Sequence, residues 1–242
     1  MTPDEYVAVI GRDGRALADA AEAAGMDATV AACPGWTVAS LVAHVGEVHD
    51  FWRRIAAEQL DDPEKMQRAV PELEGDELLA WYRAGVDQLV SVLAAADPST
   101  PVWSWASQKD IAFVQRRMAQ ETVVHRWDAE AAAGRVHQID PALAVDGVDE
   151  FLDFFAPFAR KGAEPVSGTV HLHATDADGE WFIEPGDDTL AVRREHAKGD
   201  VAVRASAADL LLLLWRRPAA GEAQVFGDSD VLARFLARTD LE

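Results

Sequence analysis

The chain has 242 residues, of which 49% are apolar and 26% charged, so it is long enough to bury the core of one large domain or of two smaller ones. Its formal net charge of −20 argues against nucleic acid and anionic membrane surfaces as partners. The sequence has no stretch of about 18 apolar residues, no signal-peptide pattern and one cysteine, Cys33, which together predict a cytoplasmic protein without an internal disulfide.

Four amphipathic segments occupy the first half of the chain. The first begins with the capping pattern of Thr2 and Glu5, with Pro3 at the first helical position. The fourth is expected to end at Gly134. The expected helices are residues 3 to about 25, 37 to about 60, about 76–96 and about 107–133. Four such helices joined by loops predict a helical bundle.

The pattern changes after a fifth helix, which is expected from Asp140 to about Arg160. Beyond Lys161, alternating residues predict strands near 169–174, 181–184, 189–194, 201–205 and 224–226, with helices at 207–217 and after Asp228. The fold class is therefore α+β in two domains. We expect a helical bundle over residues 1–160 and a small α+β domain over residues 165–242.

Glu121 and His125 are the first candidate functional residues. They stand four residues apart in the fourth helix, so both side chains lie on one helix face. Val114 and Met118 precede them on that face, which therefore starts apolar. A divalent metal satisfies a carboxylate and an imidazole together, and an ordinary Glu–His hydrogen bond is the alternative.

A third ligand has to come from another helix. His44 falls in the apolar stripe of the second helix, and His44, Glu121 and His125 together would make a catalytic zinc set with an open fourth position. Spacing alone leaves open whether His44 faces Glu121 or is a core-edge histidine. His49 is a rival or a fourth ligand, or else a surface histidine. Asp128 either orients His125 or is solvated.

Two further features have plainer interpretations. His171 and His173 share one side of the first strand, where a metal pair is possible and an exposed sheet face is the expectation. Cys33 precedes Pro34 and Gly35, and we expect a packed turn residue there, not a reactive thiol.

Two motifs carry a resemblance to a known family. Cys33-Pro-Gly-Trp-Thr-Val38, followed by Leu41-Val-Ala-His44-Val45, resembles the N-terminal signature of the mycothiol-dependent maleylpyruvate isomerase family. Glu121-x-x-x-His125-Arg-Trp-Asp128 resembles its second signature. The resemblance implies a DinB-like four-helix bundle that binds a divalent metal, zinc in the best-known members, through His44, Glu121 and His125. It also implies a C-terminal domain similar to a sterol carrier protein.

The resemblance also implies a reaction. The chain resembles a zinc-dependent, mycothiol-using enzyme in which a metal-bound thiolate attacks a small electrophile. Such an enzyme would be either a maleylpyruvate-type cis–trans isomerase or a mycothiol S-transferase. Arg217 or Arg216 would bind a substrate carboxylate, and the other interpretation of both is a cationic helix end. The expected partners are mycothiol and the electrophile, and the protein is expected to be a monomer or a homodimer.

A non-catalytic protein is the alternative. In that hypothesis the metal stabilises the bundle, and the C-terminal domain binds an apolar ligand or a partner protein. A structural metal site would be closed by a fourth protein ligand, with His49 as the candidate, whereas a catalytic site would keep that position open.

Overall fold

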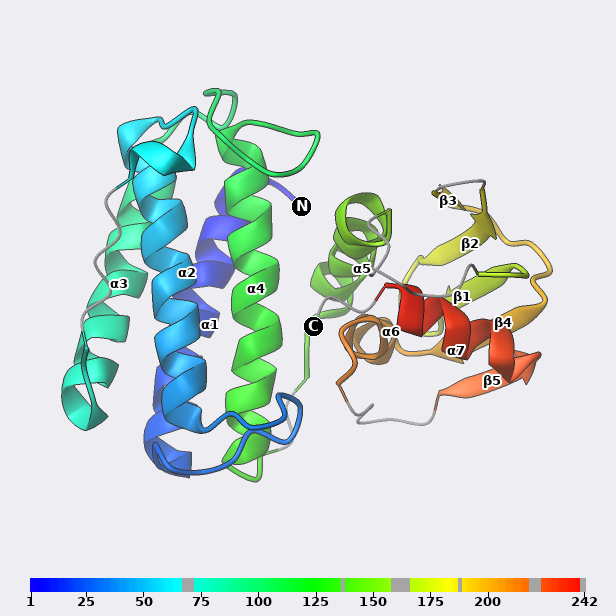
Figure 1. Cartoon of the computed structure of the whole chain (residues 1–242), viewed down its shortest axis with the longest axis horizontal. Coiled ribbons are helices and arrows are strands. Elements are labelled where there is room, and N and C mark those ends of the chain that lie inside the picture. The colour runs from blue at the N-terminus through cyan, green and yellow to red at the C-terminus, as the bar shows by residue number, and fades with distance from the viewer. Residues whose placement is uncertain (67–71, 136–137, 158–165, 187–188, 218–222, 240–242) are drawn as a thin grey trace. The chain divides into compact units, whose positions relative to one another are not determined.

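The computed structural model describes residues 1–66, 72–135, 138–157, 166–186, 189–217 and 223–239. The chain divides into two compact units, Met1–His137 and Gln138–Glu242. The first is helical and the second combines a sheet with helices (Figure 1), so the predicted α+β fold class is confirmed. Within the described ranges, no helix has the length and apolar character needed to cross a membrane.

Four long helices build the first unit, and they lie side by side (Figure 1). They are α1 (Pro3–Ala24), α2 (Val38–Glu58), α3 (Gly75–Ala95) and α4 (Ile111–Ala132). Helices α1 and α2 each pack against both α3 and α4. A short 3-10 turn, Pro63–Lys65, follows α2.

Side-chain caps set where the helices begin. The Thr2 hydroxyl accepts the backbone N–H of Glu5 at 3.3 Å, and the Glu5 carboxylate accepts that of Thr2 at 2.6 Å, as the capping pattern predicts. Helix α4 begins at Ile111, about one turn later than predicted. The reason is that the Asp110 carboxylate accepts the backbone N–H of Phe113 at 2.9 Å and so caps the helix there.

Helix α4 differs from the other three in what it buries. The core side chains of α1, α2 and α3 are mostly apolar, with Leu17, Leu41 and Tyr82 among those that are completely buried. Helix α4 also buries polar side chains: Gln115, Arg117, Gln120, Thr122, His125, Asp128 and Glu130. Because buried polar groups need partners, α4 is where a functional site is expected.

The second unit contains a five-stranded sheet in the order β3-β2-β1-β4-β5. The strands are β1 (Val170–Ala174), β2 (Glu180–Pro185), β3 (Leu190–Arg193), β4 (Val201–Ala205) and β5 (Gln224–Gly227). Neighbouring strands are antiparallel except β1 and β4, which are parallel. The helices are α5 (Pro141–Glu150), which continues into a π-helical turn (Phe151–Phe155), α6 (Ala207–Leu214) and α7 (Ser229–Arg238).

The strand register gives the sheet one apolar face. Leu172 on β1 lies opposite Trp181 on β2 and Val203 on β4, and all three are completely buried. Helices α6 and α7 pack against β1 and β4, and α5 packs against α6. Since successive residues of a strand point to opposite faces, His171 and His173 belong to the other face.

The structure groups the chain differently from the predicted domains at one point. The sequence assigns the fifth helix to the first domain, over residues 1–160, and starts the second at residue 165. In the structure α5 belongs to the second unit, which starts at Gln138, because its packing partner is α6. The predicted end of this helix near Arg160 lies outside the described residues.

Candidate metal centre

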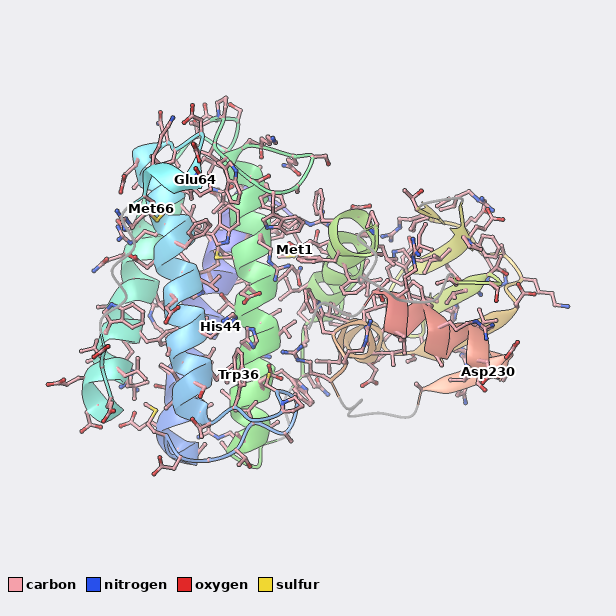
Figure 2. The ribbon with its side chains drawn as sticks, in the orientation of Figure 1. Met1, Trp36, His44, Glu64, Met66 and Asp230 are labelled. Atoms are coloured by element: carbon pink, nitrogen blue, oxygen red, sulfur yellow. The ribbon has the colours of Figure 1, made fainter. Side chains whose placement is uncertain are left out.

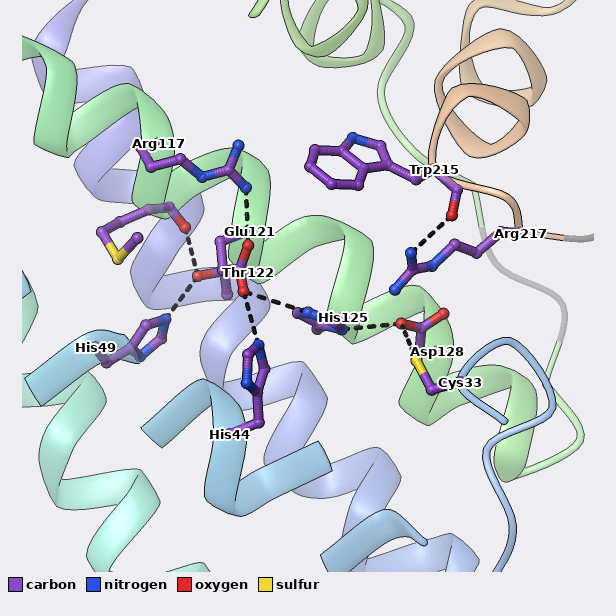
Figure 3. Close-up of polar contacts among 11 residues, drawn as sticks. Cys33, His44, His49, Arg117, Glu121, Thr122, His125, Asp128, Trp215 and Arg217 are labelled. Carbon is purple, nitrogen blue, oxygen red and sulfur yellow. Dashed lines mark hydrogen bonds and ion pairs between the residues drawn. The ribbon is translucent and has the colours of Figure 1, made fainter. Parts of the chain in front are cut away.

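Helices α2 and α4 bring the three predicted metal-ligating side chains together. Nε2 of His44 lies 3.2 Å from Oε1 of Glu121, and Nε2 of His125 lies 3.3 Å from the same oxygen (Figure 3). One ligand-forming atom from each of the three residues lies within 4.8 Å of the others. His44 therefore faces Glu121, which the spacing of the sequence had left open.

Trp36 forms an aromatic wall beside this cluster. Its ring centroid lies 5.0 Å from that of His44 and 6.5 Å from that of His125, and Figure 2 shows Trp36 and His44 close together. The His44 side chain is 39% exposed, whereas that of His125 is only 10% exposed. The cluster is thus more exposed at His44 than at His125.

Asp128 fixes the orientation of His125. Its Oδ2 lies 2.9 Å from Nδ1 of His125, and the carboxylate is buried, so the interpretation of Asp128 as a solvated residue is wrong. A carboxylate at Nδ1 favours a proton on that nitrogen, so Nε2 is the nitrogen that a metal ion would take as its ligand in place of a proton. The thiol of Cys33 is buried 3.8 Å from the same oxygen, as expected for a packed turn residue.

Arg117 is a site residue that the sequence analysis missed. Its Nη2 donates to Oε2 of Glu121 at 2.8 Å, and its side chain is buried. The other carboxylate oxygen, Oε1, is the one near both histidines. The available signal was the i,i+4 spacing of Arg117 and Glu121 on a helix, which is typical of an ion pair.

The charges of the cluster favour a cation. Burial by itself would raise the pKa of Glu121, but His125, His44 and Arg117 outweigh it and hold the pKa well below its ordinary value. Burial would lower the pKa of His125, yet the carboxylates of Glu121 and Asp128 raise it to about 9. Two carboxylates thus stabilise positive charge here, either a proton on His125 or a metal ion.

The donor set also fits a divalent metal. Two imidazole nitrogens and one carboxylate oxygen converge. Asp128 binds Nδ1 of His125, and Arg117 binds Oε2 of Glu121, which are the atoms that the cluster does not use. Catalytic zinc sites have three protein ligands of these types, with supporting hydrogen bonds of this kind.

His49 lies outside the cluster, and its interpretation as a surface histidine is wrong. It is completely buried, and its Nε2 donates to the hydroxyl of Thr122 at 2.9 Å, because that hydroxyl donates in turn to the carbonyl of Met118 at 2.6 Å. Its ring stacks on Tyr82 with 5.9 Å between the centroids. Burial lowers the pKa of His49 to about 4. Among the described residues, the three-ligand cluster does not include it.

The two candidate arginines follow α6 in the second unit. Arg216 donates to the carbonyl oxygens of Leu214 and Leu236, and to the hydroxyl of Thr239 at 2.8 Å. Leu236 and Thr239 lie at the end of α7, so Arg216 stabilises a helix C-terminus. Nη1 of Arg217 donates to the carbonyl oxygen of Trp215 at 2.8 Å.

Models of protein families match both units. The model of the mycothiol maleylpyruvate isomerase N-terminal domain matches residues 7–130, and that of the MDMPI C-terminal domain matches residues 142–234. No curated protein matches the chain.

Solved structures share the fold. The crystal structure of the mycothiol-dependent maleylpyruvate isomerase has a TM-score of 0.66 at 14% identity, with 93% of each chain covered. A histidine-to-alanine mutant of a mycothiol-dependent maleylpyruvate isomerase has a TM-score of 0.62 at 14% identity, with 88% of each chain covered. At this identity the likeness shows the fold and leaves the chemistry to the residues of the site.

Proposed function

The chain belongs to the mycothiol maleylpyruvate isomerase family, a family of enzymes, and from this premise we propose that it is a metal-dependent, mycothiol-using enzyme of the cytoplasm. The cluster of His44, Glu121 and His125 carries the proposal. These three residues would hold a divalent metal ion, with zinc as the first candidate. When bound, the ion lowers the pKa of a coordinating thiol, which supplies the nucleophilic thiolate at neutral pH.

The residues around the cluster keep it ready for binding. Asp128 accepts the Nδ1 proton of His125 and leaves Nε2 as the ligand atom. Arg117 occupies Oε2 of Glu121, so Oε1 is turned to the two histidines. The partial exposure of His44 gives a small thiol a route to the cluster. His49 is bound to Thr122, which favours an open fourth position over the closed site of a structural metal.

Two reactions of a thiolate with a small electrophile fit this site. In isomerisation of the maleylpyruvate type, the sulfur adds to one carbon of a cis double bond, the resulting single bond rotates, and elimination releases the trans product and the thiol. In S-transfer, the carbon–sulfur bond remains and the adduct is the product. We propose that Arg217 or Arg216 binds the substrate carboxylate; of the two, Arg216 also holds the end of α7 through its guanidinium.

Metal content is the first test. His44→Ala, Glu121→Ala and His125→Ala are each expected to lose one zinc per chain, measured by elemental analysis after dialysis, while circular dichroism keeps its helical signal. Asp128→Asn is expected to bind zinc about 10–100-fold more weakly, because it removes the acceptor that fixes His125. Glu47→Ala, on an exposed position of α2, is the matched control and should keep full zinc content. Unchanged zinc in any of the three variants would remove that residue from the ligand set.

Thiol binding is the second test. Cobalt-substituted protein has an absorption spectrum that changes when a thiolate becomes a ligand, so mycothiol should change it in the native chain and not in His125→Ala. Conversion of maleylpyruvate, and then of other small electrophiles, would distinguish isomerase from transferase. Metal that binds without any response to mycothiol would contradict the enzyme proposal and favour the metal-stabilised binding module.

A further inference from the structure

Three histidines surround one carboxylate on the sheet of the second unit. Nε2 of His171 contacts Oε2 of Glu180, and Nδ1 of His173 lies 2.5 Å from Oε1. Nδ1 of His196 lies 3.1 Å from the same Oε1. The ligand-forming atoms of His171, Glu180 and His196 all lie within 4.8 Å of one another. We call these four residues the sheet cluster.

The strand register explains how the sheet cluster forms. His173 lies directly opposite Glu180 in the antiparallel pair of β1 and β2. His171 is two residues earlier on β1, so it points to the same face of the sheet. Helices α6 and α7 contact β1 and β4, and the completely buried apolar side chains of these strands, such as Leu172 and Val203, lie on the opposite face, so we place the helical layer on that face. Both side chains of the histidine pair are therefore free of the helical layer.

His196 reaches the cluster from the connection between β3 and β4, residues 194–200. In the sheet order, β2 and β1 lie between these two strands, so the connection has to cross both. The rings of His171 and His196 meet edge to face with 5.0 Å between their centroids. The side chain of His171 is only 7% exposed, and that of His196 is 76% exposed. The expectation of an exposed histidine at position 171 was therefore wrong.

The chemistry of the cluster is selective. Burial by itself would raise the pKa of Glu180, but hydrogen bonds from His173, His196 and His171 outweigh it and lower the pKa, so the carboxylate is charged at neutral pH. Imidazole nitrogens with one carboxylate suit zinc and its neighbours in the first transition series. Calcium and magnesium prefer sets made of oxygen atoms. The exposure of His196 leaves room for water at the remaining coordination positions.

We propose that His171, Glu180 and His196 form a second site for a divalent transition-metal ion, and that His173 holds the Glu180 carboxylate in place. The bound ion joins β1 and β2 to the 194–200 connection, and so fastens this connection to the sheet. All four residues belong to the second unit, and the inference does not depend on the proposed function.

Zinc stoichiometry in the full-length chain tests the site. Metal-stripped protein is dialysed against zinc and analysed for bound zinc, in a His125→Ala background that removes the proposed first site. One zinc per chain is expected in this background, and addition of His196→Ala should weaken its binding at least tenfold. His196 is suited to this test because its exposed side chain contributes little to the core. Glu184→Gln is the matched control, since Glu184 lies on the same strand and pairs with Arg193, and it should keep the ion.

The outcomes separate the two sites. Equal zinc affinity in the His125→Ala protein and in its His196→Ala derivative would overturn the second site. If the first site is wrong, His125→Ala leaves the zinc content unchanged, while His196→Ala still lowers it by one.

Thermal unfolding provides an independent readout. Because an ion that binds only the folded state raises stability by mass action, zinc should raise the unfolding midpoint of the His125→Ala protein and not that of its His196→Ala derivative. A midpoint that zinc leaves unchanged in both proteins would contradict the fastening of the connection.

Discussion

Two buried histidines of the helical unit, His49 and His125, are held in opposite charge states by their neighbours. His125 lies between the carboxylates of Glu121 and Asp128, which raise its pKa to about 9. His49 is buried beside the hydroxyl of Thr122 and the ring of Tyr82, and burial lowers its pKa to about 4. The surroundings of His125 thus favour positive charge at the imidazole, whereas those of His49 favour the neutral, packed imidazole.

His49 predicts a loss of stability in acid. Its folded pKa of about 4 lies below the ordinary value of 6.5, so the unfolded chain binds more protons between these two values. The stability that the chain has with His49 neutral is therefore fully present above pH 6.5, and it is lost as the pH falls through 4. The two pKa values differ by an amount that corresponds to roughly 3 kcal/mol of unfolding free energy.

A variant without a titrating group isolates this effect. His49→Gln retains an N–H donor for Thr122 and cannot take up the proton. Urea unfolding at pH 7 and at pH 4.5 should show a smaller loss of stability in the variant than in the native chain. An equal loss in the two proteins would mean that His49 is not the group responsible.

At the scale of elements, α2 and α3 approach closely at a glycine. A Cβ added at Gly46 would lie 2.2 Å from Cζ3 of Trp81, which is far inside contact distance. By contrast, a Cβ added at Gly85 on α3 would meet no atom within 4 Å. The first glycine is required by packing between helices, whereas the second only lowers the helix propensity.

The two glycines make a matched pair of substitutions. Gly46→Ala is expected to lower the free energy of unfolding by about 1–3 kcal/mol, because moving the Trp81 ring costs more than the roughly 1 kcal/mol gained in helix propensity. Gly85→Ala should raise the free energy of unfolding by about 0.5–1 kcal/mol. Chemical unfolding of both variants measures the difference, and stabilisation by Gly46→Ala would show that Trp81 moves at little cost.

At the scale of the whole molecule, charge is the dominant feature. The chain has 42 acidic and 22 basic residues, and the excess of negative charge repels itself in the folded state. Salt screens this repulsion over distances beyond about 10 Å at 0.1 M.

Added salt is therefore expected to stabilise the protein. The unfolding midpoint of metal-stripped protein should rise between about 0.01 and 0.3 M sodium chloride, because the Debye length falls in this range. Differential scanning calorimetry measures the change. A midpoint that falls with salt would show that individual ion pairs, such as that of Arg126 and Asp13, outweigh the net repulsion.

The sequence by itself determined the features that depend on neighbours along the chain. The capping pattern at Thr2, the i,i+4 pair of Glu121 and His125, and the alternation at His171 follow from backbone hydrogen bonds and from the fixed periods of helix and strand. The family signatures at residues 33–45 and 121–128 likewise use short spacings, and the matched family models bear out the resemblance.

Only the tertiary structure decided which distant residues meet. The approach of α2 to α4 places His44 against Glu121 and leaves His49 with Thr122. The sheet order brings His196 over His171, and the packing of α5 on α6 moves the division between the units to residue 137. Such contacts depend on how apolar faces pack, and packing is set by the shapes of several elements together, which local periodicity does not specify.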